Sequence, residues 1–219
     1  MKTLYAIGDS FTYGEELADR NFAWPQLLGS LLGYQVINEG APASSNDKIV
    51  RRTLEYLSTK PKVDLVIIGW SLVGRSEYAD ETGYYDIWPG SQGNLFKHSE
   101  SMWRHELINH VTLHHNMEAM YKKFLQQVIL MQRYLESINV KYLMLNVLQN
   151  DEYKKHKFVD YLQYHNQINT ETFIEFDQSG MIEWAINCRK GPRGHFLEDG
   201  HQRVADKIYE HIRNLGWLP

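Results

Sequence analysis

Two short apolar runs, each ending on a glycine, constrain the fold of this chain more than any other feature. They cover residues 4–8 and 64–69, and the second is rich in β-branched side chains. Short runs of this kind are typical of strands buried on both faces, which occur mainly in parallel sheets. Weaker runs follow at residues 35–38, 140–146 and 173–176. The sequence therefore predicts a central, mostly parallel, five-stranded sheet.

Stretches with helical spacing alternate with these runs. Apolar side chains recur three or four positions apart over residues 22–32, 46–57, 117–137 and 204–215. Such an alternation places helices on both faces of a parallel sheet, so the prediction is an α/β fold, a three-layer α/β/α sandwich. No Pro/Gly/Ser-rich linker or charge block divides the 219 residues, and we expect a single domain over residues 1–219.

One segment, residues 78–115, does not follow the alternation. It is rich in Tyr, Trp and His, contains three glycines and a proline, and lacks sustained periodicity. It begins shortly after the expected strand end at Gly69, and ligands of open α/β sheets bind beyond the carboxyl ends of the strands. Two interpretations stay open: a lid or substrate-binding wall, because long loops are often functional, or an insertion whose aromatic side chains pack on the domain.

Charge and cysteine content argue against several partners and compartments. The net charge is −4 and the pI about 6.2, so the basic surface expected of a protein that binds nucleic acid or an anionic membrane is missing. Cys188 is the only cysteine, and Asp9 comes too early for a signal peptide. The longest apolar run, residues 65–70, is far shorter than the roughly 20 residues that span a bilayer. We expect a cytoplasmic protein by default, or a phage-encoded one.

Ser10 is the candidate nucleophile. It directly follows the first expected strand, and the small residues Gly8 and Gly14 lie on either side of it. This position places a hydroxyl at the carboxyl end of the strand. A serine there also commonly caps the following helix, and this structural interpretation stays open. The sequence contains no G-x-S-x-G motif, which argues against an ordinary α/β-hydrolase.

A serine nucleophile needs a base within hydrogen-bond reach, and ten histidines are candidates. His195 lies in a Gly/Pro-rich loop before the last expected helix, where the chain can return to Ser10. His201, six residues later, is the rival base.

Histidines also raise the alternative of a metal site. Glu106, His110 and His114 have helical i, i+4 spacing that suits zinc, but no further converging ligand is evident. A Gly-rich phosphate loop is missing as well. We therefore expect neither a metal nor an organic cofactor.

Four short blocks, in order along nearly the whole chain, resemble those of the SGNH (GDSL-type) hydrolases. They are Gly8-Asp9-Ser10 with Trp24-Pro25, residues 38–46, residues 69–72 and residues 195–201. In the last block of the family the catalytic histidine precedes a glycine by five positions, and Gly200 stands five positions after His195. The resemblance therefore favours His195 over His201.

The resemblance implies the flavodoxin-like SGNH fold, in the short single-domain form found in phages and bacteria, and a serine esterase without cofactors. Ser10 would be the nucleophile and His195 the base. The N–H groups of Ser10 and Ala43 would bind the oxyanion, together with the hydroxyl of Ser71, which stands where the family has asparagine. The expected partner is a small-molecule or carbohydrate ester. An O-acetyl sugar is mildly favoured because sugar faces pack on the Trp and Tyr rings of the insertion.

One departure from the family pattern concerns the acid. The family places it three residues before the histidine, and here that position is Pro192, which cannot orient an imidazole. We expect His195 to act as a dyad with Ser10, or with another acid, and Glu198 and Asp199 are the nearest carboxylates in sequence. Loss of the orienting acid costs about 10⁴ in kcat in serine proteases, so activity could be weak.

Residues after the third strand are candidates for substrate binding. Trp70, Arg75 and Glu77 fall at the mouth of the expected site, although a salt-bridged brace is the more ordinary role for the two charged residues. A rival function is an SGNH fold that has lost its triad and binds glycans through aromatic side chains. Those side chains would be Trp70, Tyr84, Tyr85, Trp88 and Trp103.

Overall fold

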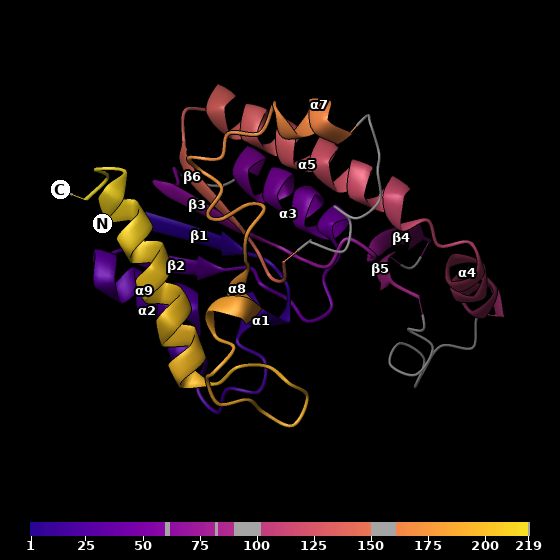
Figure 1. The fold of residues 1–219 in the computed structure, drawn as a ribbon, viewed down its shortest axis with the longest axis horizontal. Helices are drawn as coiled ribbons and strands as arrows, with labels where there is room; N and C mark the ends of the chain where they lie inside the picture. Colours follow the sequence, from indigo (N-terminus) through magenta and orange to yellow (C-terminus); the bar gives the residue numbers. More distant parts are fainter. Residues whose placement is uncertain (60–61, 82, 90–101, 150–160, 219) are drawn as a thin grey trace.

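Four parallel strands form the central sheet of the computed structural model, which describes residues 1–59, 62–81, 83–89, 102–149 and 161–218. Across the sheet the order is β2 (Gln35–Asn38), β1 (Thr3–Ile7), β3 (Leu65–Trp70) and β6 (Lys141–Asn146), as Figure 1 shows. β3 is buried along its whole length, as its apolar sequence predicts. The four runs predicted as strands at these places are thus confirmed.

The fifth predicted strand, residues 173–176, is reduced to one parallel bridge between Met144 and Phe173. The N–H of Met144 donates to the carbonyl of Thr172, and the N–H of Ile174 donates to the carbonyl of Met144, both at 2.8 Å. Pairing stops there because Glu175 has a φ of 47°, in the left-handed region, and leaves the extended conformation. The predicted count of five strands was wrong, since the sheet formed by the described residues has four.

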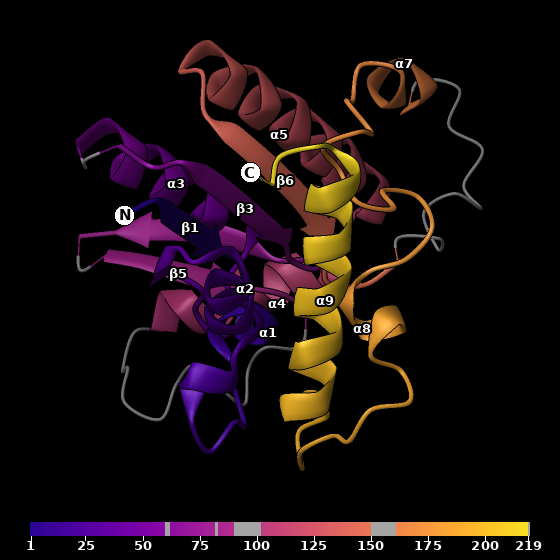
Figure 2. The same cartoon turned by 90° about the vertical axis from the view of Figure 1, so that its left-hand side faces the viewer.

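Helices cover both faces of the sheet, so the predicted α/β/α sandwich is confirmed (Figures 1 and 2). One face carries α3 (Asn46–Thr59) and α5 (Met117–Ser137), and the other carries α2 (Trp24–Leu32) and α9 (Glu198–Asn214). Successive side chains of β1 alternate between the two cores: Tyr5 packs on the α3 side, and Leu4 and Ala6 pack on the α9 side.

Two helices, α2 and α9, begin at other residues than the apolar periodicity predicts. A 3₁₀ turn, η1 (Arg20–Phe22), precedes α2, and extended Ala23 separates them, so the helix begins later than predicted. Pro25 lies in the first turn of α2, where its missing N–H costs nothing. In contrast, α9 begins before its first predicted apolar position, because extended Leu197 accepts the first N–H groups of the helix through its carbonyl.

The predicted insertion at residues 78–115 contains an antiparallel hairpin and a helix. The hairpin consists of β4 (Ser76–Asp80) and β5 (Gly83–Ile87), and α4 (Met102–Leu113) follows. β4 is fixed to α3 because Arg51 binds the carboxylate of Glu77 through two hydrogen bonds, at 2.8 and 2.7 Å. Figure 1 shows the hairpin and α4 beyond one end of α3. Residues 90–101 of the insertion lie outside the described residues.

The described residues also form three short helices: α1 (Ser10–Tyr13), α7 (Tyr161–His165) and α8 (Met181–Trp184). α1 folds closely against the end of β1, where Gly8 is required. A Cβ at Gly8 would overlap the side chain of Thr12 and lie 2.8 Å from the carbonyl oxygen of Gly69. Within the described residues, no helix has the length and apolar character needed to cross a membrane.

Candidate active site

Ser10 lies just beyond the carboxyl end of β1, as the first residue of α1. The preceding residue, Asp9, is extended and caps α1, because its Oδ1 accepts the N–H of Phe11 at 3.1 Å. The capping role considered for Ser10 is therefore filled by Asp9. The Ser10 hydroxyl remains available for another partner, although only 4% of the residue is exposed.

That partner is His195. Its Nε2 lies 2.9 Å from the Oγ of Ser10, across 185 residues of sequence. The loop that carries His195 is folded back on itself, since the N–H of Gly191 donates to the carbonyl of His195 at 2.8 Å. The ring of Phe11 packs on the imidazole with 4.7 Å between centroids. The structure thus brings together the two residues predicted as nucleophile and base.

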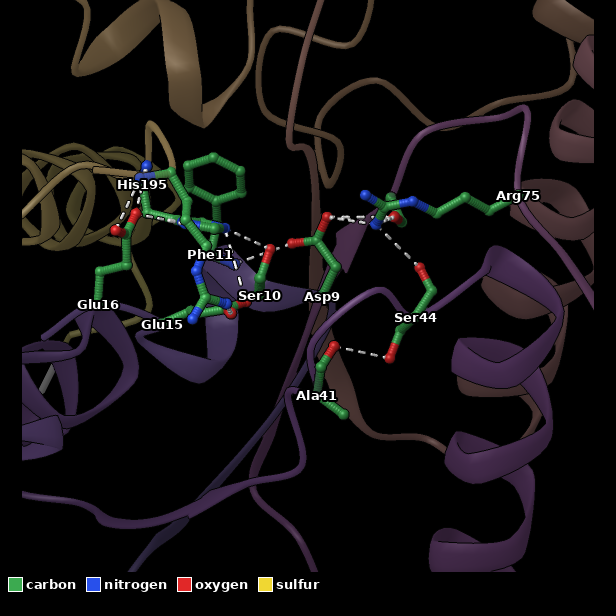
Figure 3. A network of polar contacts seen from close by, with 11 residues as sticks. Asp9, Ser10, Phe11, Glu15, Glu16, Ala41, Ser44, Arg75 and His195 are labelled. Carbon is green, nitrogen blue, oxygen red and sulfur yellow. Dashed lines mark hydrogen bonds and ion pairs between the residues drawn. The ribbon is translucent and has the colours of Figure 1, made fainter. Parts of the chain in front are cut away.

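Glu16 holds His195 from the other side of the imidazole (Figure 3). Its Oε2 lies 2.8 Å from Nδ1 of His195 and also accepts the backbone N–H of His195 at 3.1 Å. Its Oε1 accepts the N–H of Arg193 at 2.8 Å. Desolvation alone would raise the pKa of Glu16, but these hydrogen bonds from Arg193 and His195 outweigh it and hold that pKa below its ordinary value.

The negative charge of Glu16 determines which nitrogen of the His195 ring carries the hydrogen. A carboxylate can only accept a hydrogen bond, so Nδ1 carries the hydrogen and Nε2 is left with its lone pair. Nε2 then accepts the hydrogen bond of the Ser10 hydroxyl. A base oriented by an acid and bonded to a hydroxyl is the arrangement that activates serine nucleophiles.

Sequence reasoning missed Glu16 because it looked for the acid beside the histidine. The two carboxylates proposed there, Glu198 and Asp199, have other partners. Both face Arg189: Glu198 lies 3.2 Å from its guanidinium, and Asp199 accepts its backbone N–H at 3.0 Å. The proposal of Glu198 or Asp199 as the acid is therefore corrected, and the available signal was a pair of carboxylates, Glu15 and Glu16, close after the candidate nucleophile.

The rival base, His201, lies in the core. None of its surface is exposed, its Nδ1 accepts the N–H of Trp24 at 3.2 Å, and its Nε2 has no partner among the described residues. Desolvation, with a smaller contribution from His195, lowers the pKa of His201 to about 3. The structure gives it no contact with Ser10, in agreement with the preference for His195.

Burial of neutral His201 predicts acid sensitivity. The folded state does not protonate His201 until the pH reaches about 3, whereas the unfolded state does so near 6.5, so stability is lost as the pH falls below 6.5. Between pH 6.5 and 4.5 this residue should lower the free energy of unfolding by about 2–3 kcal/mol. His201→Asn retains an acceptor for Trp24, and urea unfolding at both pH values should show a smaller loss in this variant. An equal loss in both proteins would contradict the prediction.

Asp9 and Arg75 form an ion pair beside the nucleophile. Nη1 of Arg75 lies 3.3 Å from Oδ2 of Asp9, whose side chain is 1% exposed. Burial raises the pKa of Asp9, and the charge of Arg75 counteracts this effect. The same Nη1 also donates to the Oγ of Ser71 at 2.8 Å and to the carbonyl of Ser44 at 3.4 Å. Arg75 thus connects three segments around Ser10, as Figure 3 illustrates.

The hydroxyl of Ser71 does not have the predicted oxyanion role. It accepts from Arg75, and it donates its one hydrogen to Oδ2 of Asp9 at 3.1 Å. The backbone of Ser71 is held by Asn46, whose amide accepts its N–H at 2.8 Å and donates to its carbonyl at 3.2 Å. Ser71 therefore fixes Asp9 and the end of β3, and this part of the prediction was wrong.

The loop after β2 carries the second predicted oxyanion donor, Ala43. Its φ is 61°, a left-handed conformation that glycine adopts more readily than alanine. The loop is anchored to the end of β1, since the N–H of Ala41 donates to the carbonyl of Gly8 at 3.1 Å. Within the described part of the chain, the N–H groups of Ser10 and Ala43 have no hydrogen-bond acceptor. Both remain available to a ligand.

The predicted substrate-binding residues after β3 have different positions. Trp70 is completely buried and packs edge-on against Phe124 in the core, so its predicted contact with substrate was wrong. Glu77 is paired with Arg51, which matches the brace interpretation. Of these three residues, only Arg75 reaches the site. The central carbon of its guanidinium lies 5.5 Å from the centroid of the Trp88 ring.

The remaining aromatic and metal candidates lie elsewhere. Tyr84 is 58% exposed, with Arg51 stacked 3.8 Å from its ring centroid, and the side chain of Trp103 lies outside the described residues. His110 lies on α4, and its ring centroid is 4.6 Å from that of His114, which directly follows the helix. Among the side chains that the structure describes, no three metal-binding groups converge.

Comparison with solved structures finds a similar fold in a lipolytic G-D-S-L family protein and in two esterases. A member of the lipolytic protein G-D-S-L family from Veillonella parvula DSM 2008 matches with a TM-score of 0.54 and 12% identity, over 96% of this chain and 97% of its own. The psychrotrophic esterase EstA from Pseudoalteromonas sp. matches with a TM-score of 0.55 and 13% identity, over 98% of each chain. An acetyl xylan esterase, AlAXEase, matches with a TM-score of 0.50 and 16% identity, over 96% of this chain and 99% of its own. The chain has the SGNH hydrolase fold.

Sequence comparison gives a family without an assigned activity. No curated protein matches the chain. The profile of a family described as "Family of unknown function (DUF6071)" matches residues 12–218, a range that includes Glu16 and His195 and begins just after Ser10. Because the match covers nearly the whole length, the chain belongs to the DUF6071 family.

Proposed function

We propose that this protein is a serine esterase with a Ser10–His195–Glu16 triad. The observation that carries the proposal is the continuous chain of contacts, 2.9 Å from Ser10 Oγ to His195 Nε2 and 2.8 Å from His195 Nδ1 to Glu16. All three side chains lie at the carboxyl ends of the strands, where α/β folds bind their ligands. The esterases among the solved structures with the same fold add support.

The proposed reaction has two stages. In the first, the Ser10 oxygen attacks the ester carbonyl while His195 Nε2 accepts the hydroxyl proton, and Glu16 stabilises the imidazolium that forms. The N–H groups of Ser10 and Ala43 bind the oxyanion. The C–O bond to the alcohol breaks, and the alcohol leaves with the proton from Nε2. In the second stage, water attacks the acyl-Ser10 ester while His195 Nε2 accepts its proton. The bond between the acyl carbon and Ser10 Oγ breaks, Nε2 returns the proton to Oγ, and the carboxylic acid leaves.

We place the substrate among carbohydrate esters, with O-acetyl sugars as the first candidates. The similarity to an acetyl xylan esterase supports this class. A catalytically impaired glycan-binding module is less well supported. The main reason to consider such a module was the missing acid of the triad, and Glu16 lies where that acid is needed, beside Nδ1 of His195. In addition, Trp70 is buried and cannot stack on a sugar.

Covalent labelling tests the proposal. A fluorophosphonate reacts only with an activated serine, so the wild type should be labelled at Ser10, with the site mapped by mass spectrometry. Ser10→Ala should not be labelled, and His195→Ala should be labelled far more slowly. Ser30→Ala is the matched control, because Ser30 is an exposed serine on α2, and it should be labelled like the wild type. A wild type labelled no more than Ser10→Ala would contradict the proposal.

A further inference from the structure

A second carboxylate, Glu15, lies beside the reacting nitrogen of His195. Its Oε2 is 3.7 Å from Nε2, the atom that contacts Ser10, whereas Glu16 occupies Nδ1 on the other side of the ring. Figure 3 shows Ser10, Glu15 and Glu16 gathered around His195. The two adjacent glutamates therefore face different atoms of one imidazole, and only Glu16 is needed to orient it.

The two oxygens of Glu15 have different surroundings. Oε1 accepts a hydrogen bond from Nη1 of Arg193 at 2.7 Å. Oε2 has no hydrogen-bond donor among the described residues, and the Glu15 side chain is 20% exposed. The Arg193 side chain is 73% exposed, and a pair this open contributes little to stability. A half-buried carboxylate with a free oxygen beside the reacting nitrogen is suited to bind a donor on the substrate.

The reaction geometry determines which part of the substrate reaches Glu15. The leaving alcohol takes its proton from Nε2, so its oxygen must come within about 3 Å of that nitrogen. Oε2 of Glu15 lies 3.7 Å from the same nitrogen. A hydroxyl on the neighbouring carbon, whose oxygen is three bonds from the leaving oxygen, can therefore come within hydrogen-bond reach of Oε2, whereas the acyl group lies toward Ser10 and Ala43.

We propose that Glu15 is a specificity-determining residue that binds a free hydroxyl in the alcohol part of the substrate. This hydroxyl is carried by the carbon next to the esterified carbon. The substrate class is then a partly acylated polyol, such as a sugar with a free hydroxyl next to the ester. This inference rests on the proposed esterase function. A hydrogen bond from a neutral hydroxyl to a carboxylate should favour such substrates by roughly ten- to a hundredfold in kcat/KM.

A matched pair of substrates tests the proposal. 2-Hydroxyethyl acetate has the adjacent hydroxyl, and 2-methoxyethyl acetate has a similar inductive effect but no donor. The wild type should prefer the first by tenfold or more in kcat/KM. In Glu15→Ala the ratio should fall close to one, and in Glu15→Gln, which keeps an uncharged acceptor, it should be intermediate. Glu118→Gln on α5 is a distant acidic control and should retain the wild-type ratio.

Fluorophosphonate labelling of every variant separates this inference from the proposed function. If Ser10 is labelled and both esters are cleaved, but the ratio is near one in the wild type or unchanged in Glu15→Ala, the role of Glu15 is refuted and the esterase stands. If the wild type neither cleaves the esters nor reacts at Ser10, the esterase itself is refuted, and the role of Glu15 with it.

Discussion

Replacing Glu16 by glutamine is expected to lower kcat for p-nitrophenyl acetate about 10⁴-fold, the loss seen when the orienting acid of a serine triad becomes an amide. The amide can keep the contact with Nδ1 of His195, but it has no charge with which to stabilise the imidazolium. An amide that presents its NH₂ group to Nδ1 would also favour the wrong tautomer, in which Nε2 carries the hydrogen and cannot accept the Ser10 proton.

Glu198→Gln and Asp199→Asn are the matched controls for this prediction. Both carboxylates bind the exposed Arg189, and surface pairs of this kind contribute little. Both variants should hydrolyse the ester at close to the wild-type rate, and thermal unfolding should confirm that Glu16→Gln is folded at the assay temperature. If either control loses as much activity as Glu16→Gln, Glu16 does not have the assigned role.

Ser10→Ala and His195→Ala are each expected to lower kcat for the same ester by up to about 10⁶-fold, toward the uncatalysed rate. The nucleophile and its base act as one unit, so removing either one leaves nothing for the other to activate. The double variant should therefore be no slower than the single variants. Stopped-time assays at high enzyme concentration measure these rates, and losses that multiply in the double variant would show that the two residues act independently.

The strands and helices were predictable because burial on both faces leaves a direct mark on the sequence. β3 is apolar throughout and is buried throughout. The predicted fifth strand is a shorter and less apolar run, and the left-handed conformation of Glu175 ends its pairing after one bridge. Such a turn depends on the path of the chain after residue 176, and no periodicity of side chains reports it.

The candidate site was predictable where a residue belongs to a motif and unpredictable where it depends on tertiary contact. Ser10 and His195 were candidates by their positions beside expected elements, and the resemblance to the SGNH blocks favoured them. Glu16 reaches its partner across 179 residues, and only the folded loop around Gly191 and Arg193 brings them together. Likewise, the role of Ser71 depended on which neighbour accepts its single hydrogen, and that neighbour, Asp9, lies 62 residues away in the sequence.

The three hydrogen bonds of Glu16 make assembly of the site an all-or-none event. One carboxylate holds the imidazole of His195, the backbone of His195 and the backbone of Arg193, so the base and the loop that carries it share this anchor. Ser10 and Glu16 in turn belong to one short segment that begins at the end of β1. A departure of the loop removes base and acid contact from the serine together. The proposed catalytic site would then be either complete or inactive, with no intermediate form in which an unoriented histidine still faces the nucleophile.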